Sequence, residues 1–143
     1  MTPPTSAGVG YSGTPLIRKL GLQPPLKYFV VNGPAEFPAW LGPLPNGVER
    51  VVEQPEPLVA AHLFTTKKAE LNRHLKNWRT RLTPTGFIWI SWPKKAAKIL
   101  SEGDENLIRE LALPLGFVDV KVCEVSETWS GLKLVIRKAE RES

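Results

Sequence analysis

The stretch 59–93, VAAHLFTTKKAELNRHLKNWRTRLTPTGFIWISWP, predicts a strand, a helix and a second strand in succession. Val59–Phe64 is an apolar run of strand length. Thr66–Leu82 is the clearest helix of the chain, because its large apolar side chains recur on one stripe: Leu71, Leu75, Trp78 and Leu82. Thr83–Gly86, with its proline and glycine, is expected to separate this helix from the strand Phe87–Trp92.

Upstream of this unit, shorter signals predict two helices and two strands. The segment Thr14–Gly21 suits a short helix, with threonine as its cap, proline at its first position and glycine at its end. Lys27–Asn32 is a mostly apolar run typical of a buried strand, and Val48–Val52 follows a Pro-Asn-Gly turn. The connection between them has room for one short helix, near Phe37–Leu41.

Downstream, the pattern predicts one more helix and a closing hairpin. Asp104 is expected to cap a helix over Glu105–Leu113. Phe117–Val125 then predicts a strand, and Leu132–Arg137 predicts a strand that returns antiparallel to it. Alternate valines of the first of these strands are expected to share one face: Val118, Val120 and Val122.

Alternating strands and helices followed by a hairpin predict the fold class. It is an α/β fold, a Rossmann-like three-layer sandwich with a mostly parallel sheet and a C-terminal antiparallel hairpin. Residues 14–138 are expected to form one domain, with a flexible segment at 1–13 and a frayed, charged tail at 139–143. No apolar stretch is long enough to cross a membrane.

Composition narrows the classes of function. The 143 residues carry a net charge of +5, a modest excess that permits contact with nucleic acid or an anionic metabolite without identifying either. Cys123 is the single cysteine, so neither an internal disulfide nor a thiolate metal cage is expected, and a cytoplasmic location is favoured. His62 and His74 lack carboxylates at suitable spacing, so no metal site is expected. His62 is expected to be a hydrogen-bonded core residue.

The second half of the chain resembles class I methyltransferases. The run LFTTKKAELNRHLKNWRTRLTPTGFIWISWP, at 63–93, is similar to the helix, P-x-G turn and strand found late in that fold, and LGFVDVKVCEV with LKLVIRK is similar to its closing hairpin. The resemblance implies a cofactor held by a glycine-rich turn after the first strand. Here Asn32-Gly33-Pro34-Ala35 stands in that place, and Glu53 is the only good candidate for the acid that would hold ribose hydroxyls.

Nearly the whole chain is also similar to a family of small bacterial proteins catalogued as a domain of unknown function. Five motifs carry the likeness: YSGTPL at 11–16, LGPLP at 41–45, SWPKK at 91–95, LALPLG at 111–116 and ETWSGLK at 127–133. This resemblance implies the same fold and supplies no catalytic residue.

The candidate ligand site lies where the strand Phe87–Trp92 ends. Ligands of open α/β sheets bind beyond the carboxyl ends of the strands, so Ser91, Trp92, Lys94 and Lys95 are the residues expected to form a site. The lysines would attract a phosphate or carboxylate, and the indole would stack on a planar ring. The alternative is a capped strand end with solvated lysines.

Other segments carry weaker candidates. Tyr11 and Ser12 precede a helix N-terminus and are candidate flap residues or anion contacts. Trp129 is expected to pack against the edge of the sheet, while Gly131 permits a turn. The basic side of the long helix is a candidate nucleic-acid surface or a solvated face: Lys67, Lys68, Arg73, His74, Lys76, Arg79 and Arg81.

The sequence therefore favours a non-catalytic, cytoplasmic binding module for an anionic small molecule or a protein partner, with no cofactor. The first alternative is an enzyme related to methyltransferases with an altered cofactor site. The second is a weak nucleic-acid binder that uses the long helix. Since the glycine-rich turn is missing, S-adenosylmethionine is expected to bind weakly or not at all.

Overall fold

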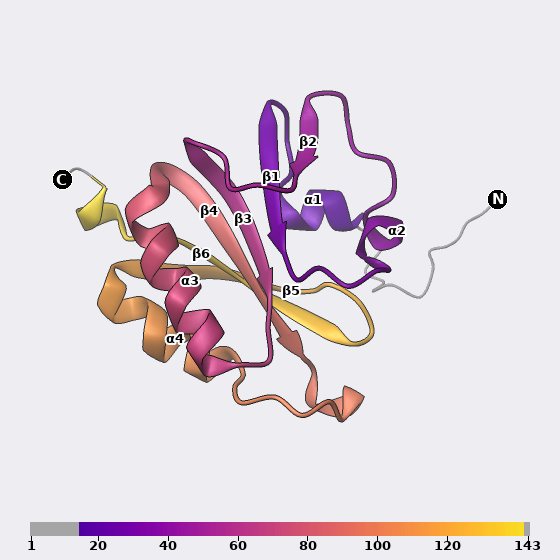
Figure 1. The fold of residues 1–143 in the computed structure, drawn as a ribbon, viewed down its shortest axis with the longest axis vertical. Helices are drawn as coiled ribbons and strands as arrows, with labels where there is room; N and C mark the ends of the chain where they lie inside the picture. The colour runs from indigo at the N-terminus through magenta and orange to yellow at the C-terminus, as the bar shows by residue number, and fades with distance from the viewer. Residues whose placement is uncertain (1–14, 142–143) are drawn as a thin grey trace.

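The computed structural model describes residues 15–141, which form a six-stranded sheet with helices on both faces (Figure 1). The strands are β1 (Leu26–Val31), β2 (Val48–Val51), β3 (Leu58–Phe64), β4 (Leu82–Pro93), β5 (Phe117–Glu124) and β6 (Trp129–Ile136). The helices are α1 (Leu16–Leu20), α2 (Phe37–Leu41), α3 (Lys68–Arg81) and α4 (Glu105–Ala112). Short 3-10 turns complete the chain: η1 (Lys95–Ala97), η2 (Leu113–Leu115) and η3 (Lys138–Glu140).

The strand order is β2-β1-β3-β4-β6-β5. The first four strands pair in parallel, and β6 runs antiparallel to both β4 and β5. This arrangement confirms the predicted fold class, a mostly parallel Rossmann-like sheet closed by an antiparallel hairpin.

The two faces of the sheet are covered by different helices, which gives the predicted three layers. On the first face, here the α3 face, α3 and α4 pack on the sheet (Figure 1), and the α3 stripe is buried as expected at Leu71, Leu75 and Trp78. The opposite face, the α1 face, is covered by α1 and α2, with Leu20 and Phe37 fully buried. The cap of α4 is also confirmed, because Asp104 Oδ1 accepts hydrogen bonds from the backbone N–H groups of Asn106 and Leu107.

The order of the strands creates a switch point at the carboxyl ends of β1 and β3. From β1 the chain passes through α2, on the α1 face, to β2 at the edge of the sheet, whereas β3 continues through α3 on the opposite face. Connections that leave in opposite directions open a crevice between the two strands, and this is where α/β sheets usually bind ligands.

Strand β5 departs from the predicted alternation because it contains a β-bulge. Asp119 pairs with Leu134 and Lys121 pairs with Lys133, so Val120 is an extra residue without a partner in the ladder. A bulge reverses the side-chain alternation that follows it. The prediction that Val118, Val120 and Val122 share one face is therefore wrong: Val118 pairs with Val135 on the α1 face, and Val122 pairs with Leu132 on the α3 face.

Strand β4 begins earlier than the sequence indicates. The sequence predicts that Thr83–Gly86 separates α3 from the strand, but this segment belongs to β4, whose ladder with β3 is irregular between Leu58 and Ala60. Gly86 is needed there, since a Cβ at this position would lie 2.6 Å from the carbonyl oxygen of Val59. Gly86 is thus required because two strands approach closely at this position, not because the chain turns there.

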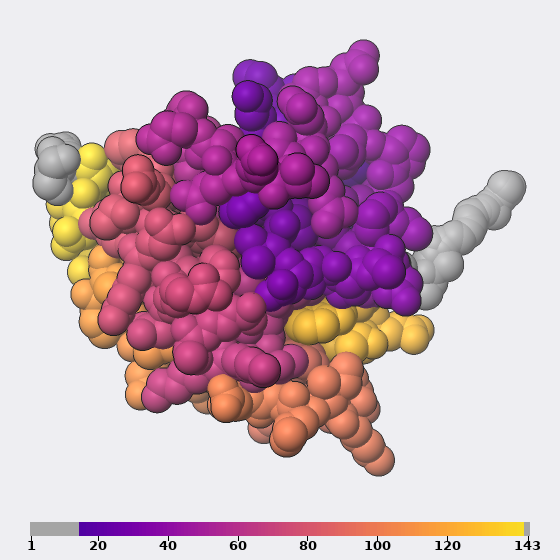
Figure 2. Space-filling model, viewed as in Figure 1, coloured from indigo at the N-terminus to yellow at the C-terminus, as the bar shows by residue number. Residues whose placement is uncertain are grey.

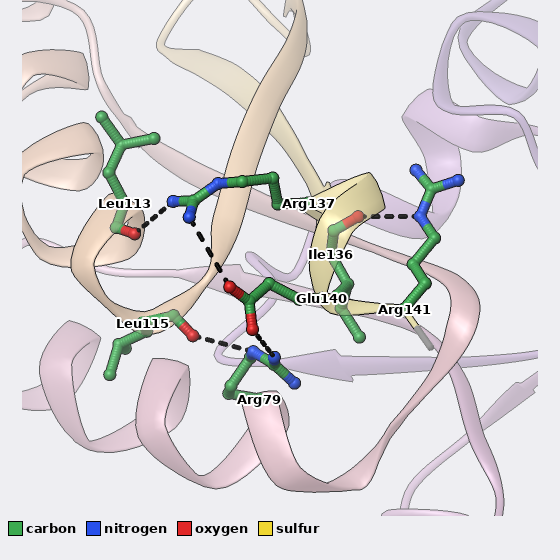
Figure 3. Close-up of polar contacts among 7 residues, drawn as sticks. All are labelled: Arg79, Leu113, Leu115, Ile136, Arg137, Glu140 and Arg141. Atoms are coloured by element: carbon green, nitrogen blue, oxygen red, sulfur yellow. Dashed lines mark hydrogen bonds and ion pairs between the residues drawn. The ribbon is translucent and has the colours of Figure 1, made fainter. Parts of the chain in front are cut away.

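The C-terminal turn η3 is held against α3 and η2 by a set of arginines (Figure 3). The Glu140 carboxylate lies 3.6 Å from Arg79 and 3.8 Å from Arg137. The same two guanidinium groups donate hydrogen bonds to the carbonyl oxygens of Leu115 and Leu113. The fraying expected from residue 139 is thus replaced, up to residue 141, by a turn with defined contacts.

Two findings bear on the remaining predictions about the ends of the chain and the membrane. The segment 1–13, which the sequence predicts to be flexible, and the last two residues of the tail lie outside the described residues. Across residues 15–141, no helix is both long and apolar enough to cross a membrane.

Candidate functional site

The switch point between β1 and β3 is bridged by a carboxylate from α3. Glu70 Oε2 accepts a hydrogen bond of 2.7 Å from the Asn32 side chain, at the end of β1. Its second oxygen, Oε1, accepts a 2.6 Å hydrogen bond from the Thr65 hydroxyl, at the end of β3. One glutamate therefore ties together the carboxyl ends of the two strands on either side of the switch point.

These contacts keep Glu70 ionised. Burial raises the pKa of the Glu70 carboxyl. The hydrogen bonds from Thr65 and Asn32, together with the nearby His74 and Arg73, lower this pKa by more than burial raises it. The pKa of Glu70 therefore lies below its ordinary value. In the sequence, Glu70 stands out only as an acid on a basic helix. Its position along the chain could have indicated a role at the switch point, because Asn32 and Thr65 each follow a strand directly and Glu70 lies in the first turn of the next helix.

The segment that replaces the glycine-rich turn is packed against the protein itself. A Cβ at Gly33 would lie 2.9 Å from the Val30 side chain and 3.0 Å from Arg50 Nη2. The Arg50 guanidinium also lies over the Phe37 ring, 5.7 Å from its centroid. Gly33 thus makes room for a side chain from β2, and the helix that follows, α2, has only five residues.

The structure places Ser91 inside the protein, whereas Trp92 is largely buried and also lines the groove beyond β4. Ser91 is fully buried and pairs in the sheet with Gly131, and Trp92 is 8% exposed within the core on the α3 face. A Cβ at Gly131 would lie 3.2 Å from both Trp89 and Val125. Gly131 therefore lies within β6 and permits close packing, not the turn that the sequence suggested.

Lys94 and Lys95 border an open groove of about 950 Å³ between the end of β4 and the start of α4. Figure 2 shows the segment after β4 projecting at the lower edge of the molecule. Lys94 forms an ion pair of 2.7 Å with Glu124, whereas Lys95 takes part in no ion pair within residues 15–141. The groove also contains acidic side chains, namely Glu102, Asp104, Glu105 and Glu110.

Most of these acids are already engaged. Glu102 accepts a hydrogen bond from the backbone N–H of Lys68 at the start of α3, and Asp104 caps α4. Glu105 pairs with Arg109 at 2.9 Å. The groove thus presents one unpaired lysine, Lys95, and a Lys94 that would have to leave its partner to bind an anion.

The remaining sequence candidates are distributed over the molecule. Tyr11 and Ser12 lie outside the described residues. His74 is partly buried, with Nδ1 2.9 Å from the carbonyl oxygen of Glu70, and its ring packs on Trp78. In the part of the chain that the structure describes, no three His, Cys, Asp or Glu side chains come together as metal ligands.

The expected core histidine is confirmed, and it joins a polar row that could not be seen in the sequence. His62 on β3 lies between Tyr28 on β1 and Ser91 on β4, all fully buried. Its Nε2 is 2.7 Å from Ser91 Oγ, and its Nδ1 forms a hydrogen bond with the Tyr28 hydroxyl. The imidazole also stacks on Phe64, with ring centroids 4.4 Å apart.

This serine–histidine pair is not arranged to activate a nucleophile. Burial, with a smaller effect of Arg50, lowers the pKa of His62 to about 3, so the imidazole is a poor base. Burial also raises the pKa of Tyr28, so its hydroxyl keeps its proton and can donate it to Nδ1. With the Tyr28 hydroxyl as the donor to Nδ1, the ring proton resides on Nε2 and is donated to Ser91, which is the reverse of the transfer that a nucleophilic serine needs.

Comparisons with known proteins identify the fold alone. No protein-family model matches the sequence, and no curated protein is detectably similar to it. Solved structures of methyltransferases do match. A SAM-dependent methyltransferase from Aquifex aeolicus aligns with a TM-score of 0.55 and 17% identity, over 85% of this chain and 87% of that one. The CcbJ methyltransferase from Streptomyces caelestis aligns with a TM-score of 0.53 and 9% identity, over 85% of this chain and 92% of that one.

LepI, in its complex with SAM, aligns with a TM-score of 0.52 and 15% identity over 85% of this chain. This chain spans less than two thirds of some matched proteins, 39% of LepI and 62% of a type 11 methyltransferase from Sulfolobus solfataricus. The likeness establishes a methyltransferase-type scaffold, in agreement with the resemblance seen in the sequence.

Proposed function

We propose that this domain is a non-catalytic binding module for an anionic small molecule, built on a methyltransferase-type scaffold. The observation that supports this proposal most is the bridge formed by Glu70 across the switch point. The Asn32 and Thr65 donors, which would be available to a ligand in an open crevice, are satisfied by a carboxylate of the chain itself.

The bridged switch point disfavours S-adenosyl compounds for two physical reasons. The ionised Glu70 would repel the carboxylate of such a ligand at close range, in a site partly shielded from water. In addition, the space that a glycine-rich turn leaves for a cofactor is taken by the Arg50 guanidinium next to Gly33. A methyltransferase activity on this scaffold would need a cofactor bound in an altered way.

The ligand site that we propose is the groove beyond β4, with Lys95 as the first contact and Lys94 as the second. Lys94 is one-quarter exposed and Glu124 is more exposed, so the ion pair between them lies at the surface. Surface pairs of this kind are worth about 0–1 kcal/mol, and an incoming anion can replace the carboxylate at little cost.

We expect S-adenosylmethionine and S-adenosylhomocysteine to show no micromolar binding in calorimetry. A matched control is the Glu70→Gln variant, which removes the charge and keeps the shape of the side chain. If charge repulsion at the switch point contributes, this variant gains affinity over the wild type. Micromolar binding by the wild type would contradict the proposal and support an enzyme with an altered cofactor site.

We expect the Lys94→Ala, Lys95→Ala double variant to lose binding of whichever anion a thermal-shift panel of nucleotides, acyl thioesters and polyanions identifies. Its stability should change by no more than about 0.5 kcal/mol at each site, as at ordinary surface positions. The control is Arg73→Ala with Lys76→Ala on α3, which should retain binding. The opposite result would place the anion on α3 and favour the nucleic-acid alternative.

A further inference from the structure

Two lysines lie directly opposite each other in the terminal hairpin. Lys121 on β5 pairs with Lys133 on β6, and both side chains extend over the α1 face. Like charges directly opposite in an antiparallel pair destabilise the sheet. A pair of this kind in a well-packed hairpin therefore calls for a physical reason.

The β-bulge at Val120 creates this pair. In a regular strand, Asp119 and Lys121 would share a face, and the carboxylate would partly neutralise the ammonium group. The extra residue sends Asp119 to the α3 face, where it receives a 3.0 Å hydrogen bond from Arg109, and sends Lys121 to the α1 face. Bulges often occur next to functional sites, where they redirect a side chain.

The charges of the hairpin are thereby sorted by face. Both acids of β5 lie on the α3 face and are paired, Asp119 with Arg109 and Glu124 with Lys94. On the α1 face, Lys121 and Lys133 take part in no ion pair within residues 15–141. The same holds for Lys19 of α1, beside them.

The side chains of Lys121 and Lys133 both reach the C-terminal end of α1, the helix that carries Lys19. Lys121 Nζ donates a 3.1 Å hydrogen bond to the carbonyl oxygen of Lys19. Lys133 Nζ lies 3.5 Å from the position of a Cβ on Gly21, two residues further along, and 4.7 Å from the centroid of the Phe87 ring. Burial lowers the pKa of Lys133, and the charge of the nearby Lys121 lowers it further.

Cys123, on the same face, supplies no negative charge. Burial raises the pKa of its thiol above the ordinary value, even though Lys19 and Lys121 act to lower it. The thiol is therefore neutral at physiological pH, and the charge of the lysine cluster is positive.

We propose that Lys19, Lys121 and Lys133 form a binding site for a compact polyvalent anion, such as the pyrophosphate or phosphate group of a small molecule. The site lies on the opposite face of the hairpin from Lys94 and is independent of the groove beyond β4. A polyvalent anion relieves the repulsion between Lys121 and Lys133, and it fits lysine, which binds phosphate as a point charge. Partial burial of Lys133 against Phe87 strengthens the attraction between its ammonium group and the anion, because the charges are less screened by water there.

The test is a calorimetric titration of the full chain with pyrophosphate. The variant is Lys121→Met with Lys133→Met, which removes both charges and keeps the apolar stems in place. We expect its dissociation constant for pyrophosphate to rise by about tenfold or more, because two charge-assisted contacts are lost. The control Lys68→Met with Lys76→Met removes the same charge from α3 and should leave the affinity unchanged.

A second measurement reports on the site itself. The Lys133 ammonium group, observed by NMR of the lysine side chains, should show a rise in pKa when pyrophosphate is added, because a nearby anion favours the charged form. This measurement uses the wild type, so it still tests the proposal if the double variant folds poorly.

The outcomes separate this site from the groove. Loss of pyrophosphate binding in Lys121→Met, Lys133→Met but not in Lys94→Ala, Lys95→Ala supports the cluster. Loss only in the second variant overturns the cluster and leaves the groove as the anion site. Absence of saturable binding by the wild type at millimolar pyrophosphate, or an unchanged Lys133 pKa, also overturns the inference.

Discussion

Replacing His62 with leucine is expected to lower the free energy of unfolding by about 3–5 kcal/mol, because the substitution leaves the Tyr28 hydroxyl and the Ser91 hydroxyl buried without a partner. Each unpaired buried group costs about 1–3 kcal/mol. In the wild type, all buried side-chain nitrogen and oxygen atoms of the described residues have hydrogen-bond partners. Urea denaturation followed by circular dichroism measures the difference.

The matched control removes the whole polar row. The triple variant Tyr28→Phe, His62→Leu, Ser91→Ala leaves no orphaned hydroxyl, so it should be more stable than His62→Leu alone by about 2 kcal/mol despite two additional substitutions. A triple variant less stable than the single one would mean that the imidazole acts mainly through packing against Phe64. The three hydrogen-bonding groups would then not form an energetic unit.

Acid is expected to destabilise the wild type through the same histidine. The pKa of His62 is about 3 in the folded protein, against 6.5 for an unperturbed histidine side chain, so the unfolded chain binds one more proton between these two values. Stability contributed by the neutral imidazole is therefore complete above pH 6.5 and is lost as the pH falls toward 3. The loss over this range is about 4 kcal/mol, with a slope of up to about 1.4 kcal/mol per pH unit.

The triple variant is also the control for this effect. It lacks His62 and keeps every other titratable group except Tyr28, which stays protonated throughout this range. The unfolding free energy of the wild type minus that of the triple variant, measured from pH 7 to pH 4, should fall steadily by about 3 kcal/mol as the solution becomes more acidic. Parallel pH profiles for the two proteins would show that His62 does not have a depressed pKa.

Most of the fold could be predicted from the sequence, because the signals that carry it are local. The apolar stripe of α3 and the capping Asp104 each lie within one element, and periodicity and cap chemistry act over a few residues. The bulge at Val120 could not be predicted in this way. It depends on which residue of β6 each residue of β5 faces, and the alternation of valines suggested a regular strand.

The candidate site was less predictable, since it depends on contacts between distant segments. Glu70 meets Asn32 from 38 positions away. Ser91 was placed correctly at the end of β4, but its side chain turns inward to His62, and the sequence does not show which way a residue at a strand end will face. Lys94 was expected to be free, whereas it meets Glu124 only because β5 lies beside β6 and β6 beside β4.

The bulge has a genetic consequence. A single-codon deletion at Val120 would make Asp119 and Lys121 neighbours in a regular ladder, paired with Leu134 and Lys133 as they are now. Lys121 and Cys123 would stay on the α1 face, and Glu124 would stay beside Lys94. The bulge therefore absorbs one extra codon without moving any other side chain to the opposite face, and the separation of lysines from acids in the hairpin would survive its loss.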